Sequence, residues 1–482
     1  MSQTIDHVAL LPAYLAAATA LAVLLTDLFS RHPVPRIAVA GIGFAATAAA
    51  AVWLGTLPPR QTFCTDTGCS LVTGGPGAAI AATTALLGLA VLALSARPLL
   101  AGDAPPGEYA FLLACSVTGG VMLAYGRDLI TLIVALETLT LPLYVLVAMR
   151  GGSRRGAVAA VNFLLVSVTA GAITLLGAAL LYAVTGTLHL TGIAAALRGD
   201  TIPLTAVAVA VIITGVGFKL AAVPLHGWAP GSYDGAPLPI AAYLSTASKL
   251  GGVAVLLWLV TEAFPPVLHI AGPVLTVLAV ATMSVGNLLA LRQRRTVRLL
   301  AASSIAQAGY LLVPLAGLTA LAGPPGTAAT AATAVLVFAL FYVMMEVAAF
   351  TGVIALRWPR ADGGELGDLA GSLRAAPGPA VVLLLALAAL AGLPPALAGL
   401  FAKITVVSSV AMAMPWLAVV VAVNAVVGLA YYLRFGVLLV RGRGTEPAPA
   451  GWPVTAVLAL SVAALVIVGF APQLLWRLAS FG

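Results

Sequence analysis

Residues 203–239 read PLTAVAVAVIITGVGFKLAAVPLHGWAPGSYDGAPLP, and this stretch decides the fold class. Its first half is an apolar run of about the length that crosses a ~30 Å hydrocarbon core as a helix. Its second half is rich in proline, which removes backbone hydrogen bonds from a helix. Non-helical backbone at membrane depth is tolerated only where it is buried in protein or lines a wet cavity. The stretch therefore predicts a broken membrane helix inside a helical bundle, with Lys219 beside the break.

The whole chain has the composition of a membrane protein. Of its 482 residues, 62% are hydrophobic and 8% are charged, whereas about a quarter of the residues of an ordinary soluble domain are charged. Barrel strands would alternate apolar and polar residues, and the apolar runs here do not. The net charge of +8 comes from basic residues scattered through short loops, so we expect a lipid bilayer and no nucleic acid as partner. The predicted class is an all-α, polytopic membrane protein.

Apolar runs between loop signals predict about fourteen membrane helices. Their approximate ranges are 9–29, 36–56, 77–96, 109–124, 128–149, 157–184, 203–224, 238–260, 270–291, 298–319, 328–356, 377–412, 415–440 and 452–471. The twelfth contains GLPPALAG, which predicts a second break, with a simple kink in a lipid-facing helix as the alternative. Because the two breaks lie five segments apart, they favour two repeated halves with a site between them.

The basic residues test this count, because loops on the cytoplasmic side of a membrane are rich in Lys and Arg. The loops predicted to be cytoplasmic hold Arg31, Arg36, Arg97, Arg150, Arg154, Arg155, Arg292, Arg294, Arg295, Arg298, Arg357, Arg360, Arg374, Arg441 and Arg443. The opposite loops hold only Arg60, Arg127, Arg198 and Arg477, and Arg434 lies near the inner end of its helix. We therefore predict a multi-pass protein of a bacterial inner (plasma) membrane with both termini extracytoplasmic.

Lys219, Lys249 and Lys403 are the only lysines among 23 basic residues, and all three fall within predicted membrane segments. A desolvated lysine can lose its proton, whereas arginine stays charged. Placing one such residue at a helix centre costs about 2.5–3.5 kcal/mol on insertion scales, so a functional reason is expected. We interpret the three lysines as proton carriers. The alternative is that each snorkels to the membrane surface or forms a permanent ion pair.

Two acidic residues lie at membrane depth with the lysines. Glu137, in the fifth segment, is predicted to be a partner of Lys219 or Lys249. Such a pair binds a proton when the charges approach and releases it when they separate, and a static ion pair is the alternative. Glu346 is the second acid.

Neutral and weakly basic side chains join the lysines and acids as candidate proton carriers. His226 stands beside the first break, where it either passes protons or caps the broken helix. Gln307 and Tyr310, with Ser303 and Ser304, either bind ordered water along a proton path or bind neighbouring helices. His226, Gln307, Tyr310 and Glu346 are together predicted to form a secondary proton path.

Neither the cysteines nor any nucleotide-binding motif in the sequence predicts a bound cofactor or metal. Cys64 and Cys69 share a Gly/Pro-rich loop that is predicted to be extracytoplasmic, where a local disulfide can form. No CxxC pair, haem-attachment motif or GxxxxGK[ST] phosphate loop occurs. Such motifs accompany redox centres and nucleotides, so the driving reaction is expected on partner subunits.

At these motifs the chain resembles the antiporter-like proton-translocating membrane subunits, in particular the subunit N (ND2) type of NADH-quinone oxidoreductase, respiratory complex I. The segments that carry the resemblance are LETLTLPLYVLVAM, LLYAVTGTLHL, GFKLAAVPLHGWAPGSYDGAP, STASKLGG, LLAASSIAQAGYLL, LAGLPPALAGLFAK and AYYLRF, between about residues 125 and 435. Their order and spacing are specific together, and each is weak alone.

The resemblance implies a core of two inverted five-helix repeats with broken helices 7 and 12. It divides the chain into an N-terminal three-helix segment (1–107), the first repeat (108–260), the second repeat (261–440) and a C-terminal helix (441–482). Flavin mononucleotide, iron-sulfur clusters and quinone are expected on partner subunits. The expected neighbours are antiporter-like and small helical membrane subunits. The resemblance also implies that Glu137, Lys219, Lys249 and Lys403 form the proton-transfer line.

The chain also departs from the family pattern. The usual acid and lysine of the sixth helix correspond here to Val158 and Asn162, and Gln307 stands where subunit N usually has histidine. Gly231 replaces the common aspartate of the APD motif, and Glu346 does not belong to the pattern. Besides the complex I subunit, two alternatives therefore stay open: a subunit of a multisubunit Na+/H+ antiporter, or a divergent paralogue that does not pump.

Overall fold

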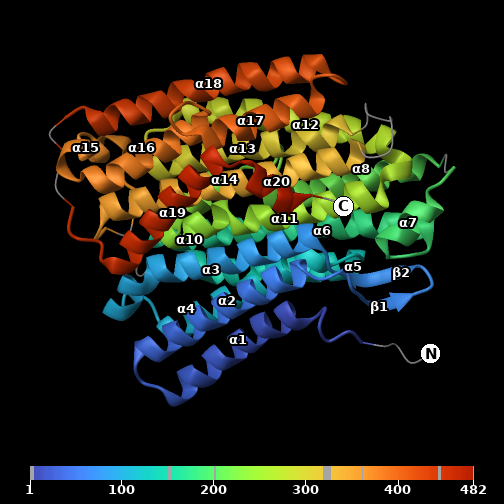
Figure 1. Ribbon diagram of the computed structural model, residues 1–482, viewed down its shortest axis with the longest axis horizontal. Coiled ribbons are helices and arrows are strands. Elements are labelled where there is room, and N and C mark those ends of the chain that lie inside the picture. Colours follow the sequence, from blue (N-terminus) through green and yellow to red (C-terminus); the bar gives the residue numbers. More distant parts are fainter. Residues whose placement is uncertain are drawn as a thin grey trace.

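The computed structural model describes residues 5–149, 153–199, 202–318, 327–360, 362–442, 444 and 447–480. Within this part of the chain, long helices lie side by side along a common direction (Figure 1). Thirteen of the described helices are long and apolar enough to cross a membrane, and two shorter apolar helices occupy the twelfth predicted segment. Each of the fourteen predicted segments is therefore confirmed as helical.

The helices of the predicted segments are, in chain order, α1 (Leu11–Phe29), α2 (Pro33–Gly55), α3 (Gly75–Ala101), α4 (Pro106–Tyr125), α5 (Leu129–Ala148), α6 (Arg154–Thr185), α8 (Pro203–Gly217), α10 (Leu238–Ser245) with α11 (Ala247–Trp258), α12 (Leu268–Arg292), α13 (Thr296–Gly317), α14 (Thr327–Arg357), α16 (Pro377–Ala391) with α17 (Leu397–Val410), α18 (Pro415–Val440) and α19 (Trp452–Phe470). Short elements lie between them: α7 (Leu190–Ala196), η1 (Phe218–Leu220), α9 (Trp228–Gly235), η2 (Leu259–Ala263), η3 (Pro265–Val267), η4 (Leu366–Leu369) and α15 (Ser372–Ala375). The short helix α20 (Gln473–Ala479) follows α19. Several long helices begin with proline, because the first turn of a helix needs no backbone N–H partner.

Both predicted breaks are present. α8 ends at Gly217, the short helix η1 holds Lys219, and the chain turns before α9 begins at Trp228. α16 ends at the cap residue Gly392, whose φ of 80° lies in the left-handed region that glycine enters without strain. α17 then begins at Leu397. A helix end leaves backbone carbonyl groups without intrahelical partners, so each break supplies hydrogen-bond acceptors within the bundle.

The eighth segment is interrupted as well, which the apolar pattern does not reveal. α10 stops at Ser245 and α11 starts at Ala247, and Thr246 between them has φ −114° and ψ −78°. Thr246 Oγ1 donates a hydrogen bond to Ala242 O at 2.7 Å, and such side-chain bonds compete with the regular helical ladder. No proline or glycine marks this point, so the sequence predicts one continuous helix.

The inner and outer helices differ in burial. Every residue in the most apolar windows of α10–α11 and α13 is buried, whereas one third of the corresponding windows of α1, α2, α18 and α19 is buried. The outer helices expose large apolar side chains such as Phe29, Ile42 and Val426. Such a surface needs lipid or another protein against it. The interior helices are the ones that hold Lys249 and Ser304.

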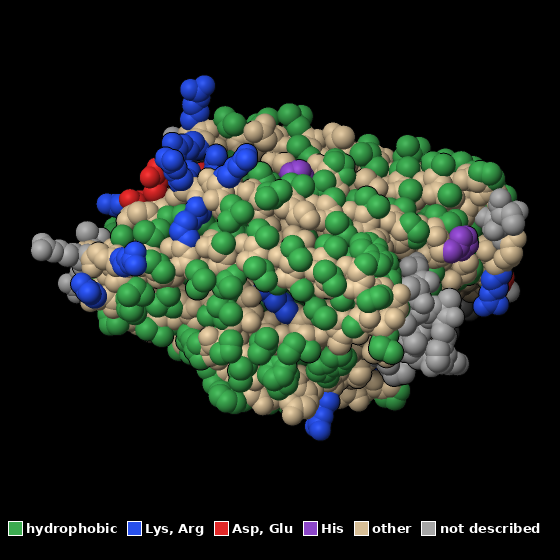
Figure 2. Space-filling view, turned by 90° about the horizontal axis from the view of Figure 1, so that it is seen from above, with side chains coloured by type: hydrophobic (Ala, Val, Ile, Leu, Met, Phe, Trp, Pro, Cys, Tyr) green, Lys and Arg blue, Asp and Glu red, His purple; other side chains and the backbone are tan. Residues whose placement is uncertain are grey.

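Charge is unevenly distributed along the bundle. In Figure 2, most of the visible Lys and Arg side chains gather at the left end, where α15 and the turn between α1 and α2 lie in Figure 1. This asymmetry agrees with the prediction that the arginine-rich loops share one face of the membrane. Arg150 and Arg443, which belong to the same predicted set, lie outside the described residues.

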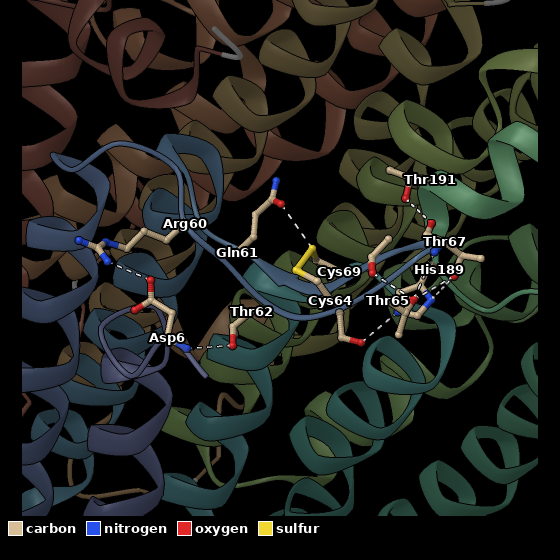
Figure 3. Close-up of a disulfide and its surroundings, with 12 residues drawn as sticks. Asp6, Arg60, Gln61, Thr62, Cys64, Thr65, Thr67, Cys69, His189 and Thr191 are labelled. Atoms are coloured by element: carbon tan, nitrogen blue, oxygen red, sulfur yellow. Dashed lines mark hydrogen bonds and ion pairs between the residues drawn. A yellow bond between two sulfur atoms is a disulfide. The ribbon is translucent and has the colours of Figure 1, made fainter. Parts of the chain in front are cut away.

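The loop of Cys64 and Cys69 forms a β-hairpin, which its Gly/Pro-rich composition does not predict. β1 (Gln61–Thr65) pairs with β2 (Gly68–Val72) in antiparallel register, with the two cysteines opposite each other. They form the disulfide that the sequence left open. At its tip the hairpin touches the loop before α7, where Thr67 Oγ1 and His189 Nδ1 are hydrogen-bonded at 3.0 Å (Figure 3).

An ion pair ties the other end of the hairpin to the start of the chain. Arg60 Nη1 lies 2.9 Å from Asp6 Oδ2, and the backbone N–H of Asp6 donates to Thr62 Oγ1 at 3.1 Å (Figure 3). The hydrogen bond from Arg60 lowers the pKa of Asp6. A carboxyl with a lowered pKa adds stability that is present above its usual pKa of about 3.9 and is lost as the pH falls through the folded-state value.

We expect Arg60→Gln to loosen the hairpin at neutral pH. Amide hydrogen exchange in residues 61–65 should be up to about fivefold faster than in the wild type, the range expected for an exposed ion pair. The difference should shrink as the pH falls below the usual aspartate pKa of about 3.9 and vanish once Asp6 is protonated in the wild type as well. Variant and wild type are compared by mass spectrometry at each pH. Equal exchange at pH 7 would show that the pair does not hold the hairpin.

Candidate functional site

Glu137 and Lys219, which the sequence predicts as partners, face each other. Glu137 lies in the middle of α5, and its Oε1 is 3.4 Å from Lys219 Nζ at the first break. The lysine side chain is 3% exposed, whereas the Glu137 side chain is 32% exposed. The distance is long for a charge-assisted hydrogen bond. The pair therefore reaches from the interior of the bundle toward its surface through a loose contact.

Hydroxyl groups provide further acceptors for the Lys219 ammonium group. Lys219 Nζ donates to Thr140 Oγ1 at 2.8 Å and to Ser167 Oγ at 3.3 Å, and Tyr144 OH donates to Ser167 Oγ. The lysine thus keeps neutral partners if Glu137 moves away. The sequence prediction missed these hydroxyls, although Thr140 and Tyr144 follow Glu137 by three and seven residues and so share its helix face.

The backbone of the first break is held by aromatic packing. Trp228 Nε1 donates to the carbonyl of Phe218 at 3.2 Å, and the Trp228 ring stacks on Phe163 with 4.6 Å between centroids. On the other side of the break, the N–H of Val223 donates to Thr282 Oγ1 at 3.0 Å. Buried polar backbone groups are costly without such partners. These contacts fix the position of the neighbouring Lys219.

Lys249 lies in the first turn after the interruption of the eighth segment and is completely buried. Its Nζ donates to two atoms of Ser304 on α13, the backbone carbonyl oxygen and, at 2.9 Å, the hydroxyl oxygen. Ser304 was predicted from its motif to bind water or a neighbouring helix, and in the structure it binds Lys249.

Glu346 faces the same region from α14. Its side chain is completely buried, and its charge interacts with that of Lys249. Four residues earlier on the same helix, the ring of Tyr342 has its centroid 5.8 Å from Lys249 Nζ, and Tyr342 OH donates to Ser245 O at 2.8 Å. Residues four apart share a helix face. The two predicted acids are thus distributed between two different lysines.

Gln307 and Lys403 bind the backbone of the second break. Gln307 Nε2 donates to Leu390 O at 3.1 Å and to Tyr432 OH at 3.2 Å. Lys403 Nζ donates to Ala391 O at 2.5 Å. Leu390 and Ala391 are the last two residues of α16, so the carbonyl groups that the break frees are the ones that bind Gln307 and Lys403.

The other two predicted residues have different surroundings. The Lys403 ammonium group lies 5.8 Å from the centroid of the Tyr310 ring, within the range of a cation–π contact. His226 Nδ1 donates to Pro224 O at 3.2 Å within the turn between α8 and α9. Among the described residues this is the one hydrogen bond of the His226 ring. The structure therefore places Tyr310 beside Lys403 and gives the His226 ring a bond within its own turn.

Two of the lysines are joined by packing. Gly252 lies one turn after Lys249 in α11, and a Cβ atom added there would be 3.0 Å from Cβ of Lys219. The two lysines thus lie on touching helix surfaces. Val158 and Asn162, at the positions where the family pattern has an acid and a lysine, are exposed on α6. Neither is among the hydrogen-bond partners of Lys219 in the part of the chain that the structure describes.

In an all-helical membrane protein with two broken helices, the buried Lys219 and Lys249 and the half-buried Lys403 define an antiporter-like proton-translocating membrane subunit. Residues 126–428 match the family model described as NADH:quinone oxidoreductase/Mrp antiporter, TM. The chain is 54% identical to NADH-quinone oxidoreductase subunit N of Salinispora tropica, over 100% of this chain and 99% of that protein. The chain belongs to the NADH-quinone oxidoreductase subunit N family. It is a proton-translocating membrane subunit of respiratory complex I.

Solved structures share this fold. A chain of respiratory complex I from Thermus thermophilus with bound aureothin is 30% identical, with a TM-score of 0.81 over 98% of this chain and 100% of that chain. A chain of the Mrp complex from Dietzia sp. DQ12-45-1b is 24% identical, with a TM-score of 0.83 over 97% of this chain and 96% of that chain. The second likeness shows the fold alone, so it gives no support to the antiporter alternative.

Proposed function

We propose that protons move through this subunit along Glu137, Lys219, Lys249 and Lys403, and that quinone reduction in partner subunits drives them. The observation that supports the proposal is that each lysine lies beside a break or interruption with acceptors from another helix around its ammonium group. Lys219 and Lys249 are buried, and Lys403 is half-buried. A fixed structural charge would need one permanent carboxylate partner. Among the described residues, only Lys219 has a carboxylate within ion-pair distance.

The Glu137–Lys219 pair is proposed to act as the switch of this line. When the carboxylate lies close, it favours the charged lysine, and when it moves away the lysine is freed to give up its proton. The 3.4 Å separation and the partial exposure of Glu137 leave room for such a movement. The hydroxyl groups of Thr140 and Ser167 hold the amine in both states.

The secondary path of Gln307, Tyr310 and Glu346 is proposed to connect Lys249 with Lys403. Gln307 and Lys403 bind neighbouring carbonyl groups at the end of α16, and Tyr310 lies beside Lys403. His226 is proposed to cap its turn, since its ring bonds locally.

The setting of the subunit is proposed as follows. Flavin mononucleotide, iron-sulfur clusters and quinone belong to partner subunits, and antiporter-like and small helical subunits cover parts of its apolar surface. The chain lies in a bacterial inner membrane with both termini extracytoplasmic, which the arginine-rich end supports. The N-terminal segment (1–107), the repeats (108–260 and 261–440) and the C-terminal helix (441–482) are the proposed functional units.

Substituting Lys249 tests the path. Lys249→Met should lower redox-driven proton transport by roughly 10²-fold or more, because it removes a group that binds and releases the proton. Lys249→Arg should fail as well, since arginine keeps its charge. Transport is measured as acidification in vesicles that contain the assembled complex.

The matched control is Thr261→Val. Among the described residues, the Thr261 hydroxyl bonds only Leu257 O within its own helical turn. This variant should transport protons at the wild-type rate. Full transport by the Lys249→Met complex would contradict the proposed path. Sodium/proton exchange by the isolated subunit would instead support the antiporter alternative.

A further inference from the structure

Glu346 has no hydrogen-bond partner although it is completely buried. Among the described residues, neither oxygen of its carboxyl group has a donor within reach. An ionised carboxylate in such a place loses its hydration without compensation, at a high cost. A buried group of this kind in a native fold calls for a reason.

The surrounding tyrosines do not supply that partner. Tyr233, Tyr342 and Tyr432 all interact with the charge of Glu346. The hydroxyl groups of Tyr233 and Tyr342 donate to the carbonyl groups of Leu244 and Ser245, at 3.1 and 2.8 Å. Tyr432 OH is hydrogen-bonded to Ser303 Oγ at 2.5 Å. The three tyrosine hydroxyl groups are therefore bonded elsewhere and do not donate to the carboxyl group.

The positive charge beside Glu346 is Lys249. The side chain of Lys249 is also completely buried, and its ammonium group is held by Ser304 and by the face of Tyr342. A buried charge is stabilised by an opposite charge nearby. Two buried groups of opposite charge can also both become neutral when one proton passes between them, which leaves their total charge unchanged.

We propose that Glu346 is a proton-binding residue that exchanges its proton with Lys249. Because the two groups are not within ion-pair distance, the step needs a bridging water or an approach of the two side chains. In the exchange an N–H bond of the Lys249 ammonium group breaks, the electron pair stays on Nζ, and an O–H bond forms on the Glu346 carboxylate. The pair is neutral overall before and after the step. Glu346 then forms with Lys249 a second acid–lysine pair, besides Glu137 and Lys219. This inference rests on the proposed proton path and assigns Glu346 a specific step in it.

Glu346 is also placed to pass the proton on. Tyr432 interacts with its charge and accepts a hydrogen bond from Gln307 Nε2, which itself donates to the end of α16. The Oε1 atom of Gln307 is buried without a partner among the described residues. Gln307 thus joins Tyr432, which interacts with the charge of Glu346, to the break that holds Lys403.

The test is Glu346→Gln in the assembled complex, which replaces the carboxyl group by a neutral amide of the same shape. Redox-driven proton transport should fall at least about tenfold, since the variant cannot bind a proton there. Glu346→Asp keeps a carboxyl group and should retain measurable transport. Infrared difference spectra between the resting and working complex should show a carboxyl band in the wild type that Glu346→Gln lacks, a signal that a merely structural role would not produce.

The matched control is Thr351→Val on the same helix. Thr351 is completely buried and its hydroxyl has no partner among the described residues, so its loss should leave transport unchanged. Wild-type transport in Glu346→Gln together with a block in Lys249→Met would overturn the role of Glu346 and leave the path standing. Wild-type transport in both variants would overturn the path as well. A carboxyl band that persists in Glu346→Gln would also overturn the inference.

Discussion

Replacing Lys219 with methionine is expected to lower redox-driven proton transport by the assembled complex roughly 10²-fold or more, while the complex still assembles. The methionine fills a similar volume but can neither hold nor release a proton. Loss of the lysine also leaves Glu137 without the ammonium group that lies 3.4 Å from its carboxylate. The measurement is acidification by vesicles that contain the purified complex, with assembly followed on native gels.

Two further variants decide what the lysine does. Lys219→Arg keeps the positive charge and the contact with Glu137 but cannot readily give up a proton, so it should also block transport. Thr214→Val on α8 removes a hydroxyl whose one hydrogen bond within the described part of the chain goes to Ala210 O in its own helix, and it should have no effect. If Lys219→Arg pumped normally, the pair would be a static ion bridge.

Gly399→Ala is expected to disable the second break without touching any titratable group. A Cβ atom on Gly399 would lie 1.6 Å from Ala389 O and 2.8 Å from Ala389 Cα. Backbone atoms cannot yield as a flexible side chain does, so α17 must move away from α16. Overpacking of this kind costs about 1–3 kcal/mol. The shift should also separate Lys403 Nζ from Ala391 O, which are 2.5 Å apart.

The expected result is earlier thermal inactivation of the complex and slower proton transport. Gly378→Ala is the matched control, because a Cβ atom there meets nothing within 4 Å. It should change stability by no more than about 0.5 kcal/mol. Wild-type stability and transport in Gly399→Ala would contradict the close packing of the two half-helices.

Local sequence patterns were sufficient to predict the membrane helices and the two breaks. Length and hydrophobicity determine a membrane helix, and the prolines at Val223–Pro224 and Pro394–Pro395 interrupt it whatever surrounds them. The interruption at Thr246 and the hairpin around Cys64 and Cys69 escaped prediction. Neither has a strong local signal, because Thr246 lies in an apolar helical run and the hairpin lies in a short loop with glycine and proline nearby.

The candidate residues could be named from the sequence because a charge at membrane depth is expensive wherever it lies. Lys219, Lys249, Lys403, Glu137 and Glu346 stand out for that reason. Their hydroxyl partners did not stand out, since threonine, serine and tyrosine carry little cost in a membrane helix and occur throughout the chain.

The sequence by itself thus determined that this protein is a helical membrane bundle with two broken helices and three lysines in its membrane segments. Only the tertiary structure decided that Glu137 faces Lys219, that Ser304 binds Lys249, and that the carbonyl end of α16 binds Lys403. Hydrophobicity and proline act along the chain and can be read locally. The partner of a buried charge depends on which helix faces of distant segments meet, and packing alone settles that.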